Sequence, residues 1–204
     1  MPGGTATAAM RTIHAVRALD CNHLIGLAVR HRSGVPECFA LFVGTIEPSM
    51  NLGRLLEAHA AATPDRSLFV VGPDGWGDAG AESEPGVGPL GRVSAADLPV
   101  LCDLASALVY PSLLEGFGLP VLEAMAQGIA ALTSATTSTA EVAGDTVVLV
   151  NPLDVTTIGD ALVSVRDEPD RWAMLGEADR VRAQAFSWAA TGQRVADIYD
   201  EVAA

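Results

Sequence analysis

The chain has 204 residues, half of them apolar, which is long enough for one domain with a sizeable core. All 12 basic residues are arginine and they face 25 acids, so a net charge of −13 argues against general nucleic-acid binding. No apolar stretch reaches the roughly 18 residues of a membrane span, and the N-terminus lacks the basic-then-apolar pattern of a signal peptide.

The three cysteines, Cys21, Cys38 and Cys102, lie far apart in the chain. Their spacing fits neither a metal site nor a disulfide framework. We therefore expect buried free thiols in a reducing, cytoplasmic environment.

Residues 1–38 are predicted to form a divergent lead-in segment, distinct from a domain over residues 39–204. Four arginines against Asp20 and Glu37 make the lead-in net basic, whereas the rest of the chain has eight arginines against 23 acids. No sheet pattern is evident in it. Residues 10–29 could form one or two short helices.

From Phe39 onward, short apolar runs alternate with amphipathic segments. Fully apolar strands between helices indicate a parallel sheet covered on both faces, which is a doubly wound α/β fold. In such a fold, the ligand crevice lies at the carboxyl ends of the strands. The expected strands are residues 39–43, 67–71, 107–110, 130–133 and 147–150, and the expected helices are residues 52–62, 97–106 and 120–127, with a short turn near Glu141.

Residues 74–88 are rich in glycine, proline and acids, which predicts a mobile surface loop. Three helices are expected at residues 156–165, 169–185 and 188–203. His59 falls on the helix predicted over 52–62, and we expect it on that helix's surface or flank. On the last helix, Trp188, Val195, Tyr199 and Val202 recur at helical spacing. This stripe either packs on its own domain, is covered by the lead-in, or stays exposed as an interface.

The stretch from Glu115 to Ala126 carries the strongest functional signal. Glu115 follows the expected strand 107–110 on a loop, and Glu123 lies one turn into a helix whose first turn suits Pro120. Gly116 and Gly118 permit close approach of the backbone to a ligand, and amides at a helix start attract anions. Amides with two acceptor carboxylates suit a ligand that has both phosphate and hydroxyl groups, such as a sugar nucleotide.

This stretch, EGFGLPVLEAMA, resembles the signature of retaining glycosyltransferases of the GT-B fold, known as family 4 or glycosyl transferases group 1. The resemblance runs in the family's order from about residue 39 to the C-terminus. It covers FVGTIEP at 42–48, VGPDGWG at 71–77, LGRVS at 90–94, EVAGD at 141–145 and FSW at 186–188. It implies the C-terminal, donor-binding, Rossmann-like half of such an enzyme, with room for only that half.

The resemblance also implies roles for individual residues. Glu115 would lie beside the donor sugar as the catalytic carboxylate, and Glu123 would accept hydrogen bonds from the ribose hydroxyls. Gly44 and Thr45, in the first loop after the strand predicted over 39–43, would also bind the donor. Arg92 and Val93 would contact its nucleobase. The backbone of Gly116, Phe117, Gly118 and Leu119 would complete the donor-binding positions. The side chain of Phe117 is expected to pack. No metal and no cofactor other than the nucleotide-sugar donor is implied.

One departure from the family pattern concerns the phosphates. After Glu47 and Pro48, family members usually carry an Arg-Lys pair that holds the donor diphosphate, and this chain has Ser49 and Met50. Losing two charge-assisted contacts costs on the order of 3–6 kcal/mol, or about two to four decades of affinity.

Two functions therefore stay open. The first is sugar transfer with retention of configuration, with the acceptor bound by another polypeptide. The second is a non-catalytic remnant that binds nucleotide sugars weakly or contacts a partner, either another polypeptide or a second copy of itself.

Overall fold

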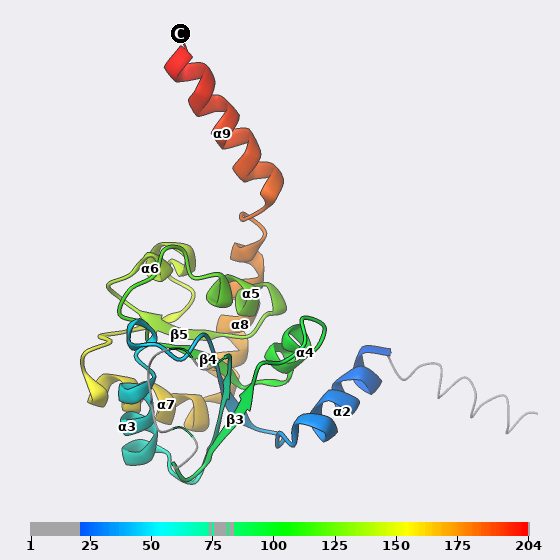
Figure 1. The fold of residues 1–204 in the computed structure, drawn as a ribbon, viewed down its shortest axis with the longest axis vertical. Helices are drawn as coiled ribbons and strands as arrows, with labels where there is room; N and C mark the ends of the chain where they lie inside the picture. The colour runs from blue at the N-terminus through cyan, green and yellow to red at the C-terminus, as the bar shows by residue number, and fades with distance from the viewer. Residues whose placement is uncertain (1–20, 74, 76–80, 82–83, 204) are drawn as a thin grey trace, which may run out of the picture.

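The computed structural model describes every residue except 1–20, 74, 76–80, 82–83 and 204 (Figure 1). Six parallel strands form one sheet in the order β3-β2-β1-β4-β5-β6. This is the strand order of a Rossmann sheet, and it confirms the predicted doubly wound α/β fold. The strands are β1 (Phe39–Val43), β2 (Ser67–Val71), β3 (Val87–Gly91), β4 (Ala107–Tyr110), β5 (Ala131–Ser134) and β6 (Val148–Val150).

Helices cover both faces of this sheet (Figure 1). On one face, α3 packs against α7; on the other, α5 packs against α8 and α4 packs against α2. The described helices are α2 (Cys21–Ser33), η1 (Pro48–Met50), α3 (Leu52–Ala62), α4 (Asp97–Leu104), α5 (Leu119–Gln127), α6 (Ser138–Ala143), α7 (Val155–Asp167), α8 (Pro169–Ala183) and α9 (Trp188–Ala203).

Helical cover on both faces of the sheet explains why β1 is apolar at every position. Leu41 and Phe42 are neighbours on β1, so their side chains point to opposite faces, and both are fully buried. Phe42 joins the cluster beneath α3 and α7, whereas Leu41 joins the cluster that α4 covers. A one-sided sheet would have put one of the two in water.

Most predicted elements are confirmed, and the exception is informative. β3 begins at Val87, so residues 87–88 belong to a strand and not to the predicted loop. Gly88 is required there, because a Cβ on it would lie 2.3 Å from the ring of Phe69 on the neighbouring strand. The prediction interpreted Gly88 as a loop residue, whereas Gly88 lies in a strand and makes room for the Phe69 ring. The part of the predicted loop at 74, 76–80 and 82–83 lies outside the described residues.

The lead-in contains α2, whose residues 21–29 lie within the predicted helical region and whose last turn extends beyond it. Val29 of α2 and Val35 just after it are buried in the same cluster as Leu41. Residues 10–20, where further helix was predicted, lie outside the described residues. The division of the chain at residue 38 stays a prediction.

Two burial predictions were wrong. His59 is buried rather than on the surface, because its ring packs against the Arg66 carbonyl and Gly86, which precede β2 and β3. Cys38 is exposed, since it lies just before β1, at the amino-terminal ends of the strands. Cys102 is buried as predicted. Among the described residues, no helix is both long and apolar enough to cross a membrane.

Candidate functional site

The carboxyl ends of β1, β2 and β3 are tied together by backbone hydrogen bonds. The Gly44 amide donates to the carbonyl of Val71 at 2.9 Å, and the Gly72 amide donates to the carbonyl of Gly91 at 2.9 Å. Gly72 has φ +150°, and a Cβ on it would lie 1.8 Å from the Gly44 carbonyl oxygen, so only glycine permits this approach. Gly44 and Thr45, which follow β1, and Arg92 and Val93, which follow β3, therefore lie at one edge.

The loop that carries Glu115 is anchored from one side to the first loop, residues 44–51, which connects β1 to α3. Asn51 is buried and donates through Nδ2 to the carbonyls of Pro111 at 2.9 Å and Pro152 at 2.6 Å. The Leu113 amide donates to the Ser49 carbonyl at 2.7 Å. Asn51 also adopts a left-handed conformation, φ 60°, which asparagine tolerates better than most residues.

Hydroxyl groups from the β5–α6 region anchor the same loop from its other side. The Ser138 hydroxyl donates to the carbonyl of Glu115 itself at 3.0 Å, and the Ser134 hydroxyl donates to the carbonyl of Ser112. Sequence reasoning did not single out Asn51, Ser134 or Ser138. Their only sequence signal is small polar side chains next to predicted strand ends, which is too common to be specific.

The Glu115 carboxylate is half-buried and accepts a hydrogen bond from the Tyr110 hydroxyl at the end of β4. Burial and this hydrogen bond raise the pKa of Tyr110, which stays protonated. The Tyr110 oxygen also lies 3.5 Å from the Met50 sulfur. A Cβ on Gly44 would lie 3.2 Å from that sulfur, so the Met50 thioether lies between Gly44 and Tyr110.

The first loop is acidic. The Ser49 hydroxyl donates to the Glu47 carboxylate at 2.5 Å, so Glu47 occupies the one donor that Ser49 offers. Arg92 is exposed at the end of β3. Arg54, in the first turn of α3, donates to the Asn51 side-chain oxygen at 2.9 Å. This cation beside the first loop was not among the predicted site residues.

The start of α5 depends on a glycine. Gly118 has φ +91° at the N-cap position, and its carbonyl accepts from the amides of Val121 at 3.0 Å and Leu122 at 3.2 Å. A Cβ on Gly118 would lie 2.4 Å from Cγ2 of Thr139. Close packing of α5 on α6 therefore requires glycine there. Gly116 and Leu119, on either side of this turn, are exposed.

Phe117 packs as predicted, against another aromatic ring. Its ring meets that of Phe186 edge-to-face at 6.1 Å between centroids, and 42% of its surface stays exposed. The Phe117 side chain thus helps attach the segment after α8 to the loop before α5.

Glu123 lies one turn into α5, is exposed, and faces α4. Burial raises the pKa of the Cys102 thiol on α4 to about 12, and the charge of Glu123 adds to this effect. Cys102 shares a buried cluster with Val93, which follows β3. Glu123 and the predicted base-reading segment thus flank the same helix. That Glu123 lines one crevice with Gly44 stays a prediction.

This fold defines a class: a Rossmann-like domain that has glycine turns and a helix N-terminus at the carboxyl ends of its strands. The comparison with known proteins is more specific. Residues 30–182 match the family described as glycosyl transferases group 1, and the chain belongs to this family.

Named relatives agree with the family. The chain is 37% identical over 163 residues to O-antigen chain mannosyltransferase B of Escherichia coli, covering 74% of this chain and 42% of that protein. It is 35% identical over 196 residues to D-inositol 3-phosphate glycosyltransferase of Thermobispora bispora, covering 85% of this chain and 46% of that protein. The chain thus spans less than half the length of these relatives.

Solved structures share the fold. Sucrose-phosphate synthase from Thermosynechococcus elongatus has a TM-score of 0.73 at 27% identity, covering 85% of this chain and 48% of that one. Anabaena HepE in complex with UDP and glucose has a TM-score of 0.74 at 20% identity, covering 86% of this chain and 52% of that one. The second likeness shows the fold alone.

The described residues contain no group of three or more His, Cys, Asp or Glu side chains that could hold a metal ion. The candidate site therefore consists of carboxylates, one tyrosine hydroxyl, backbone amides and Arg92.

Proposed function

We propose that this chain is the donor-binding half of a retaining glycosyltransferase that takes its sugar from a nucleotide-sugar donor. The observation that carries the proposal is the anchored loop of Glu115, held beside the first loop by Asn51 and Leu113 and leading directly into the N-terminus of α5. Family membership supports the proposal, and HepE, which shares the fold, has been solved in complex with UDP and glucose.

In this proposal, the amides at the start of α5 stabilise the diphosphate as it leaves, because helix N-termini favour anions and act without reorganisation. Glu115, oriented by Tyr110, contacts the hydroxyls of the donor sugar. Glu123 accepts hydrogen bonds from the ribose diol, and the backbone at Arg92 and Val93 contacts the base. The acceptor is bound by a further domain or polypeptide, and the enzyme works in the cytoplasm.

Donor hydrolysis tests this function. The chain is incubated with a panel of nucleotide sugars, with and without a candidate acceptor-domain polypeptide, and release of the nucleoside diphosphate is followed. We expect release that Glu115→Gln abolishes while Glu57→Gln, on an exposed position of α3, leaves it unchanged. Release that is insensitive to Glu115→Gln would contradict the proposal.

One observation favours a second function, a non-catalytic domain with weak nucleotide-sugar affinity. The Met50 thioether lies beside Gly44 and Tyr110, where the family resemblance expects a lysine ammonium. Met donates no hydrogen bond, and Glu47 and Glu115 add negative charge nearby. Two results together would favour this function. The chain would bind nucleosides as tightly as their diphosphates, and it would hydrolyse no donor with or without the acceptor-domain polypeptide.

A further inference from the structure

A cavity opens at the amino-terminal edge of the sheet, opposite the candidate donor site. It has a volume of about 530 Å³, within the range of small-molecule pockets. Its walls include the strand starts at Phe39 and Ser67, the segment before β5 at Ile129, and faces of α7 and α8. The proposed glycosyl transfer makes no use of this cavity.

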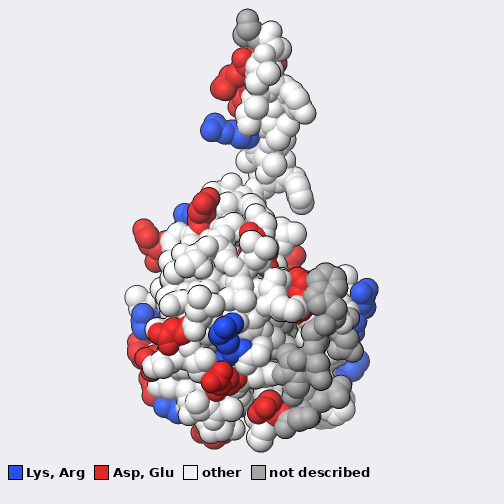
Figure 2. All heavy atoms as spheres, turned by 60° about the vertical axis from the view of Figure 1, so that its left-hand side comes forward, with Lys and Arg blue, Asp and Glu red and all other residues white. Residues whose placement is uncertain are grey.

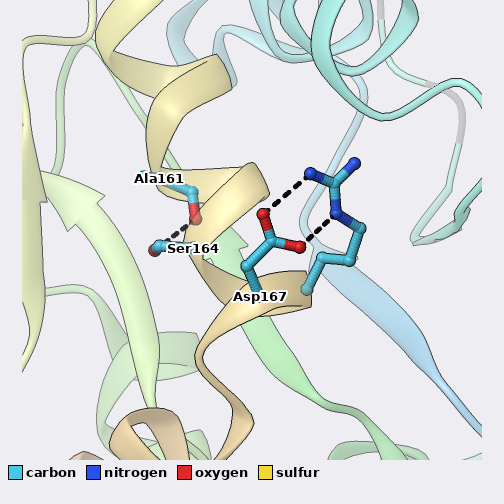
Figure 3. A network of polar contacts seen from close by, with 4 residues as sticks. Ala161, Ser164 and Asp167 are labelled. Atoms are coloured by element: carbon cyan, nitrogen blue, oxygen red, sulfur yellow. Dashed lines mark hydrogen bonds and ion pairs between the residues drawn. The ribbon is translucent and has the colours of Figure 1, made fainter.

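One wall of the cavity is apolar and held in place. Leu162 of α7 and Trp172 of α8 line it, and both are almost fully buried. The Trp172 indole donates to the Ser164 hydroxyl at 3.2 Å, which fixes the ring against α7. The Ser164 hydroxyl in turn donates to the Ala161 carbonyl at 2.7 Å, as Figure 3 shows. This wall can take the apolar part of a ligand.

The charged residues of the cavity are mostly cationic. Arg66, Arg166 and Arg180 line it, against the single acid Glu177. Acids outnumber arginines by two to one in the whole chain, so the cavity reverses the balance of the molecule. A concave site lined by one sign of charge concentrates ligands of the other sign.

Two of these arginines can serve a ligand. Arg166 is engaged by Asp167, with Nη2 2.8 Å from Oδ2 and a second contact through Nε (Figure 3). Arg180 donates to the Gln127 carbonyl at 3.0 Å, and its 3.6 Å ion pair with Glu177 is solvent-exposed and therefore weak. Arg66 forms no side-chain hydrogen bond or ion pair with any residue that the structure describes.

Arg66 is held at the cavity by its backbone. His59 is buried, and its Nε2 lies 2.9 Å from the Arg66 carbonyl oxygen. The Arg66 amide donates to the Thr63 carbonyl at 3.0 Å. The turn is therefore fixed while the guanidinium stays exposed, so His59 is a positioning residue for Arg66.

We propose that this cavity binds a small amphiphilic carboxylate, with its apolar body against Leu162 and Trp172 and its head group on Arg66, assisted by Arg180. The planar guanidinium fork matches a carboxylate in two parallel hydrogen bonds. The inference does not depend on sugar transfer.

Cys38 provides the readout, because it is exposed and lines the cavity. Alkylation of Cys38 by iodoacetamide is followed by peptide-resolved mass spectrometry, so that Cys21 and Cys102 are scored separately. Decanoate, 2-naphthoate, decanol and inorganic phosphate are added in turn. We expect at least one carboxylate to slow Cys38 alkylation fivefold or more in a saturable manner. Which of the two does so distinguishes an alkyl from an aromatic body. Decanol should protect at least tenfold less well, and phosphate not at all.

Arg66→Gln should raise the dissociation constant of the protecting carboxylate roughly tenfold or more, as expected for one charge-assisted hydrogen bond. Arg194→Gln on α9 is the matched control and should change nothing. The proposal is overturned if neither carboxylate protects at millimolar concentration, if decanol protects equally, or if Arg66→Gln has no effect. It is also overturned if Cys38 is unreactive in the ligand-free chain, because another part of the chain would then fill the cavity.

Discussion

Met50 sits where a cation would matter most for a diphosphate. Its sulfur lies 3.5 Å from the Tyr110 hydroxyl, beside Gly44 and the acidic first loop. Met50→Lys would place an ammonium there on a side chain of similar length. We expect affinity for nucleoside diphosphates to rise about 10- to 100-fold, while affinity for the nucleoside stays the same.

Isothermal calorimetry with a nucleoside and its diphosphate measures both affinities. Met50→Leu, which keeps the volume and adds no charge, is the control. If the unmodified chain already binds the diphosphate at low micromolar affinity, the argument from the missing cations is wrong.

Asp179 of α8 is fully buried, and neither carboxylate oxygen has a hydrogen-bond partner of ordinary geometry among the described residues. Burial raises its pKa to about 6, and the nearby Thr146 side chain, the Ala131 backbone and the charge of Arg182 act in the opposite direction. The unfolded carboxyl titrates near 4, so the folded state binds more protons between about pH 4 and 6. The free energy of unfolding therefore falls as pH rises through this window.

Asp179→Asn should remove this fall in unfolding free energy with rising pH, because asparagine does not titrate. The gain in unfolding free energy from the substitution should be about 1 kcal/mol larger at pH 7.5 than at pH 5. Urea unfolding of both chains at the two pH values measures it. A gain that is the same at both would mean that Asp179 titrates in the folded state as it does in the unfolded state.

At the scale of elements, α5 depends on Gly118. Gly118→Ala would force alanine to φ +91° and place a methyl 2.4 Å from Thr139 Cγ2. The strained backbone costs about 1–2 kcal/mol and the overpacking about 1–3 kcal/mol, so we expect a loss of at least 2 kcal/mol in unfolding free energy. Gly116→Ala is the control, because its Cβ would meet nothing within 4 Å.

Chemical denaturation of a double-mutant cycle separates the two costs. Thr139→Ser removes Cγ2 and keeps the hydroxyl, so it should recover the overpacking part in the Gly118→Ala background. Equal losses from Gly118→Ala and Gly116→Ala would show that the α5–α6 contact is looser than described.

The elements were predictable where chemistry repeats along the chain. The largely apolar runs of β1, β2 and β4 gave their bounds directly, because a strand buried on both faces has few polar positions. β3 was partly missed because Gly88 and Pro89 look like loop residues, although Gly88 makes room for Phe69. His59 was misplaced because its burial depends on contacts with the Arg66 carbonyl and with Gly86, which helical periodicity does not reveal.

In the candidate site, too, residues within one short stretch were predictable, whereas contacts between distant elements were not. Glu115, Gly118 and Glu123 stand out by spacing in one short stretch. Asn51 and Ser138 hold that stretch from distant elements, through backbone carbonyls that carry no sequence identity. Arg180 and Arg182 likewise act at a distance, donating to carbonyls at the ends of α5 and α6. Such side-chain-to-backbone contacts cannot be read from a single sequence.

At the scale of the whole molecule, α9 stands away from the body (Figure 1). Every described residue of α9 is exposed, including Trp188 at 84% and Val202 at 83%. Figure 2 shows its charged side chains gathered on one side, with uncharged surface opposite. This uncovered stripe fits an interface, and it decides against packing of the stripe on its own domain.

We expect the isolated chain to self-associate at micromolar concentration through this stripe. Sedimentation velocity measures the association state. The samples are the parent chain, the double variant Trp188→Gln with Tyr199→Glu, and Arg194→Gln on the charged side of α9. The double variant should sediment as a monomer and Arg194→Gln should behave like the parent. A monomeric parent chain would contradict self-association and leave an acceptor-domain polypeptide or the lead-in as the cover of this stripe.

The proposed function requires that the carboxyl edge of the sheet, and not another surface, binds the nucleotide of a sugar donor. Amide chemical-shift mapping during titration with nucleoside diphosphates tests it most directly. We predict shifts confined to Gly44, Thr45, Arg92, Val93 and residues 115–123, reduced at least tenfold in apparent affinity by Glu123→Gln. Shifts that cluster elsewhere, for example around Arg66 and Trp172, or that survive Glu123→Gln unchanged, would contradict it.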